Sequence, residues 1–168
     1  MLSRQTPRLL LRPPTVEDLE PFVEIHEDPE VMRYMTVIGP LSGRVAAWKL
    51  LAVMIGHWHL RGYGQWSVVE KATGLVIGRV GLWNPEGWPG IEVGWVIRRS
   101  HWGYGFATEA AKEALDFGFN HVGADHLISI IRSDNARSIR VAEKLGESFE
   151  RAIRFEGAES LIYGITKR

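Results

Sequence analysis

The sequence contains no cysteine among its 168 residues. This absence excludes disulfide bonds, a cysteine nucleophile and cysteine-ligated metal sites, and it is consistent with a reducing compartment. The 20 basic and 20 acidic residues cancel, so the charge balance gives no reason to expect a nucleic-acid or membrane surface as partner. Near the amino terminus the longest apolar stretch is Leu9–Leu11, which is too short for a signal-peptide core or a membrane span. We therefore expect a cytoplasmic protein.

Two familiar phosphate-binding signatures are also missing. A P-loop requires Gly-Lys-Ser or Gly-Lys-Thr at the start of a helix, and neither triplet occurs. The dinucleotide fingerprint requires a third glycine at the position that Thr108 occupies. What remains is a loop containing Gly103 and Gly105, which lets backbone N–H groups approach a phosphate at the positive end of a helix dipole. The plain alternative for this loop is a tight turn between a strand and a helix.

The segments around this loop show clear periodicity. Apolar residues alternate over 91–97, which indicates a strand with one buried face and with Glu92 and Gly94 on the other face. After the loop, small and apolar residues recur at helical spacing, which indicates a helix with one buried stripe; they are Ala107, Ala111, Ala114, Leu115 and Gly118. A buried strand at 127–131 and a helix from 135 to 145, ended by Gly146, follow.

The rest of the chain predicts elements that complete one domain. They are an edge strand at 8–12, a helix at 15–26 with a capping box, a helix at 42–61 entered by Ser42-Gly43, a hairpin of 64–70 and 75–83, and a hairpin of 148–154 and 160–166. The chain is 45% hydrophobic and has no repeat, linker or low-complexity tract, so its length suits a single core. We predict one mixed α/β domain over residues 1–168.

Three motifs together resemble a known family. They are WGYGFATEA at 102–110, Asn-Ala-Arg-Ser at 135–138 and Glu-Lys-Leu-Gly at 143–146. They are similar to the GNAT superfamily of acyl-CoA-dependent N-acetyltransferases, and most of all to its ribosomal-protein-alanine N-acetyltransferase branch. Segments 6–12 and 28–34 agree as well, so the likeness covers nearly the whole chain.

The resemblance implies a fold and an activity. The implied fold is a central mixed, mostly antiparallel, twisted sheet flanked by helices. The implied activity is direct transfer of an acetyl group from acetyl-CoA, the co-substrate, to a primary amine of a protein N-terminus or of a small molecule. The acceptor cannot be identified from the sequence, and a homodimer is left open. A catalytically silent acyl-CoA-binding domain of the same fold is the alternative.

The resemblance also implies which residues hold the cofactor. Backbone N–H groups of the loop would hold the pyrophosphate, and the loop residues are Gly103, Tyr104, Gly105, Phe106, Ala107 and Thr108. The strand edge at Trp95, Val96 and Ile97 would pair with the pantetheine arm, and a free N–H there would polarise the thioester carbonyl. For the side chains of Trp95 and Ile97 we expect core packing. Asn135 and Ser138 would contact the arm farther along.

Two residues are candidates for proton transfer. Glu92, on the polar face of its strand, would take a proton from the amine directly or through water, although a solvated strand glutamate is the plain alternative. Ser138 would protonate the leaving thiolate, because the helix at 135–145 contains no tyrosine for that task. Its alternative is a cofactor contact only, beside Asn135 as a helix cap. No acyl-enzyme is expected.

For the other polar and aromatic residues, a functional role is either undecided or disfavoured. No metal site is expected, because His57 and His59 lie on different faces of their helix. Arg98 and Arg99 would either contact a phosphate or lie as solvated charges at the end of the strand. The remaining candidates, for the floor of the acceptor site, are Trp58, Trp83 and Trp88.

Overall fold

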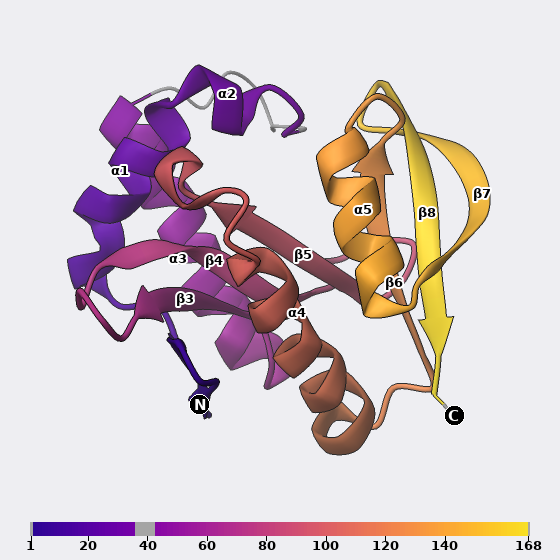
Figure 1. The fold of residues 1–168 in the computed structure, drawn as a ribbon, viewed down its shortest axis with the longest axis horizontal. Coiled ribbons are helices and arrows are strands. Elements are labelled where there is room, and N and C mark those ends of the chain that lie inside the picture. Colours follow the sequence, from indigo (N-terminus) through magenta and orange to yellow (C-terminus); the bar gives the residue numbers. More distant parts are fainter. Residues whose placement is uncertain (1, 36–42, 168) are drawn as a thin grey trace.

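The computed structural model describes residues 2–35 and 43–167. These residues form an eight-stranded sheet with the order β1-β2-β3-β4-β5-β6-β8-β7, which confirms the predicted mixed, mostly antiparallel sheet (Figure 1). The strands are β1 (Arg4–Gln5), β2 (Leu9–Arg12), β3 (Gln65–Glu70), β4 (Val76–Trp83), β5 (Glu92–Ile97), β6 (His126–Arg132), β7 (Ser148–Phe155) and β8 (Ala158–Thr166). The helices are α1 (Leu19–Glu27), α2 (Pro29–Met32), α3 (Gly43–Arg61), α4 (Phe106–Phe117) and α5 (Ala136–Leu145).

Helices cover both faces of the sheet. Helices α1 and α3 pack against each other, and α1 contacts β4, whereas α4 packs on β4 and β5 and contacts α5 (Figure 1). Val93 and Ile97 of β5 are buried in the core cluster that contains α4. Val96 is buried in the cluster that contains α1 and α3. Strand β5 is therefore covered on both faces, whereas its sequence predicted one buried face.

The sheet divides where β5 and β6 meet. These two strands run parallel, and their single register pair is Glu92 with Ile128 among the described residues. The Ile128 N–H donates to the Ile91 carbonyl at 3.0 Å. Farther along, the strands diverge, as Figure 1 shows. We call this point of separation the β5–β6 fork, and β5 leaves part of its backbone edge without a strand partner there.

Gly118 lies on the helical stripe that the sequence indicated, just after α4. A π-helical turn continues over Gly118–Val122 to Gly123, whose φ of 78° is left-handed. Gly118 itself is right-handed, and a Cβ there would lie 2.7 Å from a Leu127 methyl group. Close packing of the helix on β6 therefore explains this glycine, rather than a helix end.

The amino-terminal part shows three differences from the sequence prediction. The short strand β1 pairs with β2, so β2 is not the edge strand that was predicted. Helix α2, which begins after its cap Asp28, was not predicted. The Thr15 N–H donates to Asp18 as the capping box predicted, but the first turn is a 3₁₀ turn, so α1 begins at Leu19. Ser42, the expected entry to α3, lies outside the described residues.

Candidate active site

The glycine loop before α4 leaves its backbone donors free. Gly103 and Gly105 have φ values of 83° and 81°, a conformation that other residues adopt only with strain. A Cβ at Gly103 would meet nothing within 4 Å, so the backbone conformation, not crowding, requires glycine there. Within the described part of the chain, the N–H groups of residues 103–108 donate no hydrogen bond. These donors stand at the amino-terminal end of a 12-residue helix, where a phosphate is favoured.

The loop is braced by residues about 100 positions away, a contact that no local sequence signal revealed. Glu109, in the first turn of α4, accepts hydrogen bonds from Thr6 Oγ1 at 2.5 Å and from Arg8 Nε at 2.6 Å. Arg8 also donates to the Tyr104 carbonyl at 2.9 Å, and its guanidinium lies 4.3 Å from the centre of the Phe106 ring. Burial alone would raise the pKa of Glu109, but the hydrogen bonds from Thr6 and Arg8 outweigh it and lower that pKa.

Trp102 ties the loop to the end of β5. Its indole N–H donates to the Ile97 carbonyl at 2.6 Å. The guanidinium of Arg137, at the start of α5, lies 4.5 Å from the centre of the Trp102 ring. The structure thus brings Arg137 next to the loop, a placement that the sequence did not predict.

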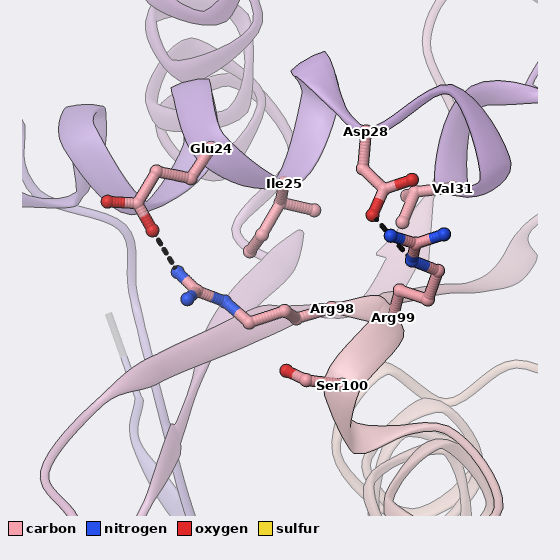
Figure 2. Close-up of a pocket in the computed structure, with 7 residues that line it drawn as sticks. All are labelled: Glu24, Ile25, Asp28, Val31, Arg98, Arg99 and Ser100. Atoms are coloured by element: carbon pink, nitrogen blue, oxygen red, sulfur yellow. Dashed lines mark hydrogen bonds and ion pairs between the residues drawn. The ribbon is translucent and has the colours of Figure 1, made fainter.

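Arg98 and Arg99 turn away from the loop toward α1. Figure 2 shows them in a pocket with Glu24 and Asp28, where Arg98 pairs with Glu24 at 2.6 Å and Arg99 pairs with Asp28 at 3.0 Å. Both charges therefore have carboxylate partners. This arrangement favours the interpretation that both arginines are charges at the end of the strand, and it disfavours the interpretation that they bind a phosphate.

Glu92 lies at the β5–β6 fork and is held by Trp88. The Trp88 indole N–H donates to Glu92 Oε2 at 2.7 Å. Burial raises the pKa of Glu92 to about 7, although the bond from Trp88 acts in the opposite direction. A carboxyl group with this pKa is half-ionised near neutral pH, as a general base should be. A Cβ at Gly94 would lie 2.8 Å from Gln65 Nε2 but 3.8 Å from Glu92 Oε1, so the Gln65 side chain, not Glu92, requires the glycine.

Ser138 is positioned by two donors from different elements. Its Oγ accepts from Asn135 Nδ2 at 3.0 Å and from the Trp95 indole N–H at 3.3 Å. Asn135 caps α5 as predicted, because its Oδ1 accepts from the Ser138 N–H at 3.2 Å. The Ser138 hydroxyl proton has no acceptor among the described residues, so it is available to a ligand. The Trp95 side chain, expected only in the core, also links β5 to α5.

The backbone of β5 alternates between two neighbours. The Ile91 carbonyl accepts from β6, and the Arg98 N–H donates to Ile77 at 2.7 Å. By alternation, Trp95 and Ile97 direct their backbone groups toward the fork, whereas Val96 directs its groups toward β4. The Ile97 carbonyl is already occupied by Trp102. The predicted pairing of this strand edge with the pantetheine arm therefore depends mainly on the backbone of Trp95 and on the Ile97 N–H.

Comparison with known proteins places this geometry in a family. Residues 8–148 match the family model described as an acetyltransferase (GNAT) domain. The chain is 31% identical to the uncharacterized N-acetyltransferase p20 of Bacillus licheniformis, over 92% of this chain and 86% of that protein. The chain belongs to the GNAT family of N-acetyltransferases.

Two solved structures share the fold of this GNAT protein. An acetyltransferase from Agrobacterium tumefaciens superposes with a TM-score of 0.87 at 26% identity, covering 99% of this chain and 95% of that one. RimL, a ribosomal L7/L12 α-N-protein acetyltransferase solved with coenzyme A, superposes with a TM-score of 0.80 at 14% identity, covering 96% and 95%. The co-substrate of GNAT enzymes is acetyl-CoA. The free N–H groups at residues 103–108 fit the pyrophosphate of this molecule.

The remaining aromatic and histidine residues of this GNAT domain have mostly structural contacts. Trp58 is buried and donates to the Gln65 carbonyl, so it belongs to the core and is not part of an acceptor floor. Trp83 is half-buried and stacks on His57 at 4.5 Å. One neutral tautomer of His57 satisfies both its ring nitrogens, which bond to the Tyr63 carbonyl and the Asn84 N–H.

Metal ligation and membrane insertion find no support in the described residues. Over 2–35 and 43–167, no group of three or more His, Asp or Glu side chains could hold a metal ion. None of the described helices is long and apolar enough to cross a membrane.

Proposed function

We propose that this GNAT enzyme transfers the acetyl group directly to a primary amine at the β5–β6 fork, with Glu92 as general base and Ser138 as proton donor. The observation that carries the proposal is that β5 links both groups to the fork. Glu92, whose pKa is near neutrality, begins this strand, and Ser138, whose hydroxyl proton has no acceptor among the described residues, is bonded by Trp95 from the opposite face of the same strand. Acetyl-CoA supplies the activated acetyl thioester.

Cofactor binding uses the backbone more than side chains. The N–H groups of Gly103, Tyr104, Gly105, Phe106, Ala107 and Thr108 would hold the pyrophosphate, and Arg8 and Arg137 add positive charge beside the loop. The backbone of Trp95 and Ile97 would pair with the pantetheine amides as an added strand does. Two further residues support the cofactor site. Val96 pairs β5 with β4, and Asn135 caps α5.

The proton balance follows from the two side chains. The ammonium group of the acceptor first loses one proton to Glu92, directly or through water, and Glu92 passes this proton to solvent. The neutral amine nitrogen then bonds to the acetyl carbon and loses its second proton to solvent. The carbon–sulfur bond breaks, and the Ser138 hydroxyl gives its proton to the leaving sulfur. Ser138 regains a proton from solvent. No covalent enzyme intermediate is needed, because the amine attacks the thioester carbon directly.

The pKa of Glu92 favours one class of acceptor. An α-ammonium group has an ordinary pKa of about 7.7–8.0, close to that of Glu92, whereas a lysine ε-ammonium has one of about 10.4. Proton transfer to Glu92 is therefore nearly balanced for an α-amine and uphill for a lysine side chain. We infer that the acceptor is an α-amine of a protein amino terminus or a weakly basic amine of a small molecule.

A panel of amines with thiol release as readout tests this function. The panel includes peptides with free amino termini, the same peptides with blocked amino termini and one lysine, and free amino acids. We expect thiol release and an acetylated product with α-amines, and loss of both in Glu92→Gln. Binding of coenzyme A without thiol release from any amine would instead favour the silent acyl-CoA-binding domain.

A further inference from the structure

A second buried carboxyl group stands beside the proposed site without any cationic partner. Glu147 follows Gly146, which ends α5, and its side chain is only 4% exposed. Its Oε1 lies 3.1 Å from Ser129 Oγ on β6, and its Oε2 is buried with no hydrogen-bond partner among the described residues. Over residues 2–35 and 43–167, no Lys, Arg or His side chain forms an ion pair with Glu147.

The protons on Ser129 and Glu147 can be counted from the geometry. Ser129 Oγ also lies 2.8 Å from the Val93 carbonyl, which can only accept. A hydroxyl group has one proton, and the shorter contact assigns it to Val93. The contact between Ser129 and Glu147 is then a hydrogen bond only if Glu147 donates. A protonated Glu147 completes a chain in which every step has one donor and one acceptor.

The surroundings of Glu147 also favour its neutral form. The charged groups facing it are Glu92 from β5 and Glu150 from β7, and both are acidic. Glu150 is itself paired with His126 at 2.6 Å. Burial raises the pKa of Glu147 to about 8, and the two negative charges act in the same direction. Only a hydrogen bond donated by Ser129 would lower this pKa, and the Ser129 proton is assigned to Val93.

We propose that Glu147 is a positioning residue that works as a neutral carboxylic acid. It donates to Ser129, Ser129 donates to the Val93 carbonyl, and the chain fixes β5 where the β5–β6 ladder ends. Val93 is the residue between Glu92 and Gly94, so this chain holds the backbone that carries the proposed base. This role rests on the proposed function, because it assigns a purpose to the position of Glu92.

Ionisation of Glu147 should break this chain. A carboxylate would compete with the Val93 carbonyl for the single Ser129 proton, and a charged acceptor forms the stronger hydrogen bond. Val93 would lose its donor, and a second negative charge would face Glu92. We therefore expect kcat/KM to rise as Glu92 ionises and to fall again as Glu147 ionises.

Infrared spectroscopy of the carboxyl C=O stretch tests the protonation state without requiring turnover. The proteins are the parent, Glu147→Gln and the control Glu150→Gln, each titrated from pH 6 to 9. We expect a protonated-carboxyl band at pH 7 in the parent and in Glu150→Gln that disappears on alkaline titration. In Glu147→Gln this band should be reduced to the signal of Glu92, which is half-protonated at pH 7 and loses its proton at lower pH than Glu147. Parent and Glu147→Gln spectra with the same protonated-carboxyl signal at pH 7 would overturn the proposal.

The pH profile of kcat/KM tests the positioning role. Glu147→Gln keeps a donor for Ser129 and cannot ionise, so it should keep the rise with pH and lose the alkaline fall. An unchanged alkaline fall in Glu147→Gln would overturn this role. If no amine is acetylated, the proposed function fails, while the infrared result still decides the state of Glu147.

Discussion

Glu92 and Ser138 differ in how their protons are held. Glu92 sits in an environment that penalises its charge, so it binds a proton more tightly than an ordinary glutamate does. Ser138 has its oxygen occupied by two N–H donors, so its proton points to neither of them. The first arrangement suits a group that must accept a proton, and the second suits a group that must give one away.

Glu92→Gln should move the rising limb of the pH profile to higher pH, where the α-amine itself loses its proton at about 7.7–8.0. In the parent, kcat/KM should increase through about pH 7 as Glu92 loses its proton. A general base typically contributes about 10²–10⁴-fold, and the deficit should be largest at about pH 7–8. Below this range Glu92 is protonated in the parent too, and above it an α-amine is already neutral. Steady-state kinetics over pH 5.5–9.5 measure the effect.

Glu156→Gln is the matched control for Glu92. The negative charge of Glu156 raises the pKa of Glu92, so its removal should shift the rising limb to lower pH without abolishing it. A Glu92→Gln profile that overlays the parent's at every pH would eliminate the general-base role.

Ser138→Ala should lower kcat while coenzyme A affinity stays nearly unchanged. The reduction should fall toward the lower end of about 10²–10⁴-fold, because thiols leave readily even without an acid. A group that acts only in the transition state lowers kcat, whereas a pure cofactor contact changes binding. Ser133→Ala, in the exposed turn before α5, is the control and should behave as the parent. A parental kcat at saturating acetyl-CoA would leave Ser138 with a binding role alone.

At the scale of elements, the loop before α4 combines a left-handed backbone with a rigid brace. The glycines supply the conformation, and Arg8 and Glu109 hold the loop against β2 and the first turn of α4. An anion site made of N–H groups is useful only if these groups keep their directions, so the brace belongs to the site.

Gly105→Asp should abolish or strongly weaken coenzyme A binding. The substitution places a negative side chain beside the N–H groups that would hold the pyrophosphate, at a position with φ of 81°. Gly123→Asp is a matched control, because Gly123 has φ of 78° and lies beyond the carboxyl-terminal end of α4. Calorimetry should show parental affinity in the control and a large loss in Gly105→Asp. Equal affinities in two folded variants would refute the assignment of the loop.

Elements with strong local signals were predictable from the sequence, and contacts between distant residues were not. Alternation of apolar residues gave β5, and caps gave both ends of α5, because these signals lie within a few residues of the structure they set. Gly118 could be placed on the helical stripe, but the reason for a glycine there could not be predicted, since it depends on Leu127 across the core. Glu92 was recognisable on a polar strand face. Glu147 was not, because its burial depends on where β7 leaves α5 relative to β6.

At the scale of the whole molecule, groups with displaced pKa values make stability depend on pH in opposite directions. Burial lowers the pKa of His26 to about 4 and also lowers that of His57. Their contribution to the free energy of unfolding is complete above the ordinary histidine pKa of about 6.5 and is lost as the pH falls. Glu92 and Glu147 have raised pKa values, so their contribution is complete below about 4.5 and is lost as the pH rises to about 7 and about 8.

Between pH 7 and 8, Glu147 makes the largest contribution to the pH dependence among the described groups with a displaced pKa, and Glu92 makes a smaller one that declines as the pH rises. The folded protein keeps a proton on Glu147 there that the unfolded chain has lost, so this group alone lowers the free energy of unfolding by up to about 1.4 kcal/mol per pH unit. For a domain of this size, that change lowers Tm by roughly 3–5 °C per pH unit. Glu147→Gln has no proton to keep at this position, so its Tm should fall much less than the parent's over the same range. Glu143→Gln, exposed near the end of α5, should retain the parent's slope. Thermal unfolding at closely spaced pH values distinguishes the three proteins, and parallel slopes for the parent and Glu147→Gln would show that Glu147 is already ionised at pH 7.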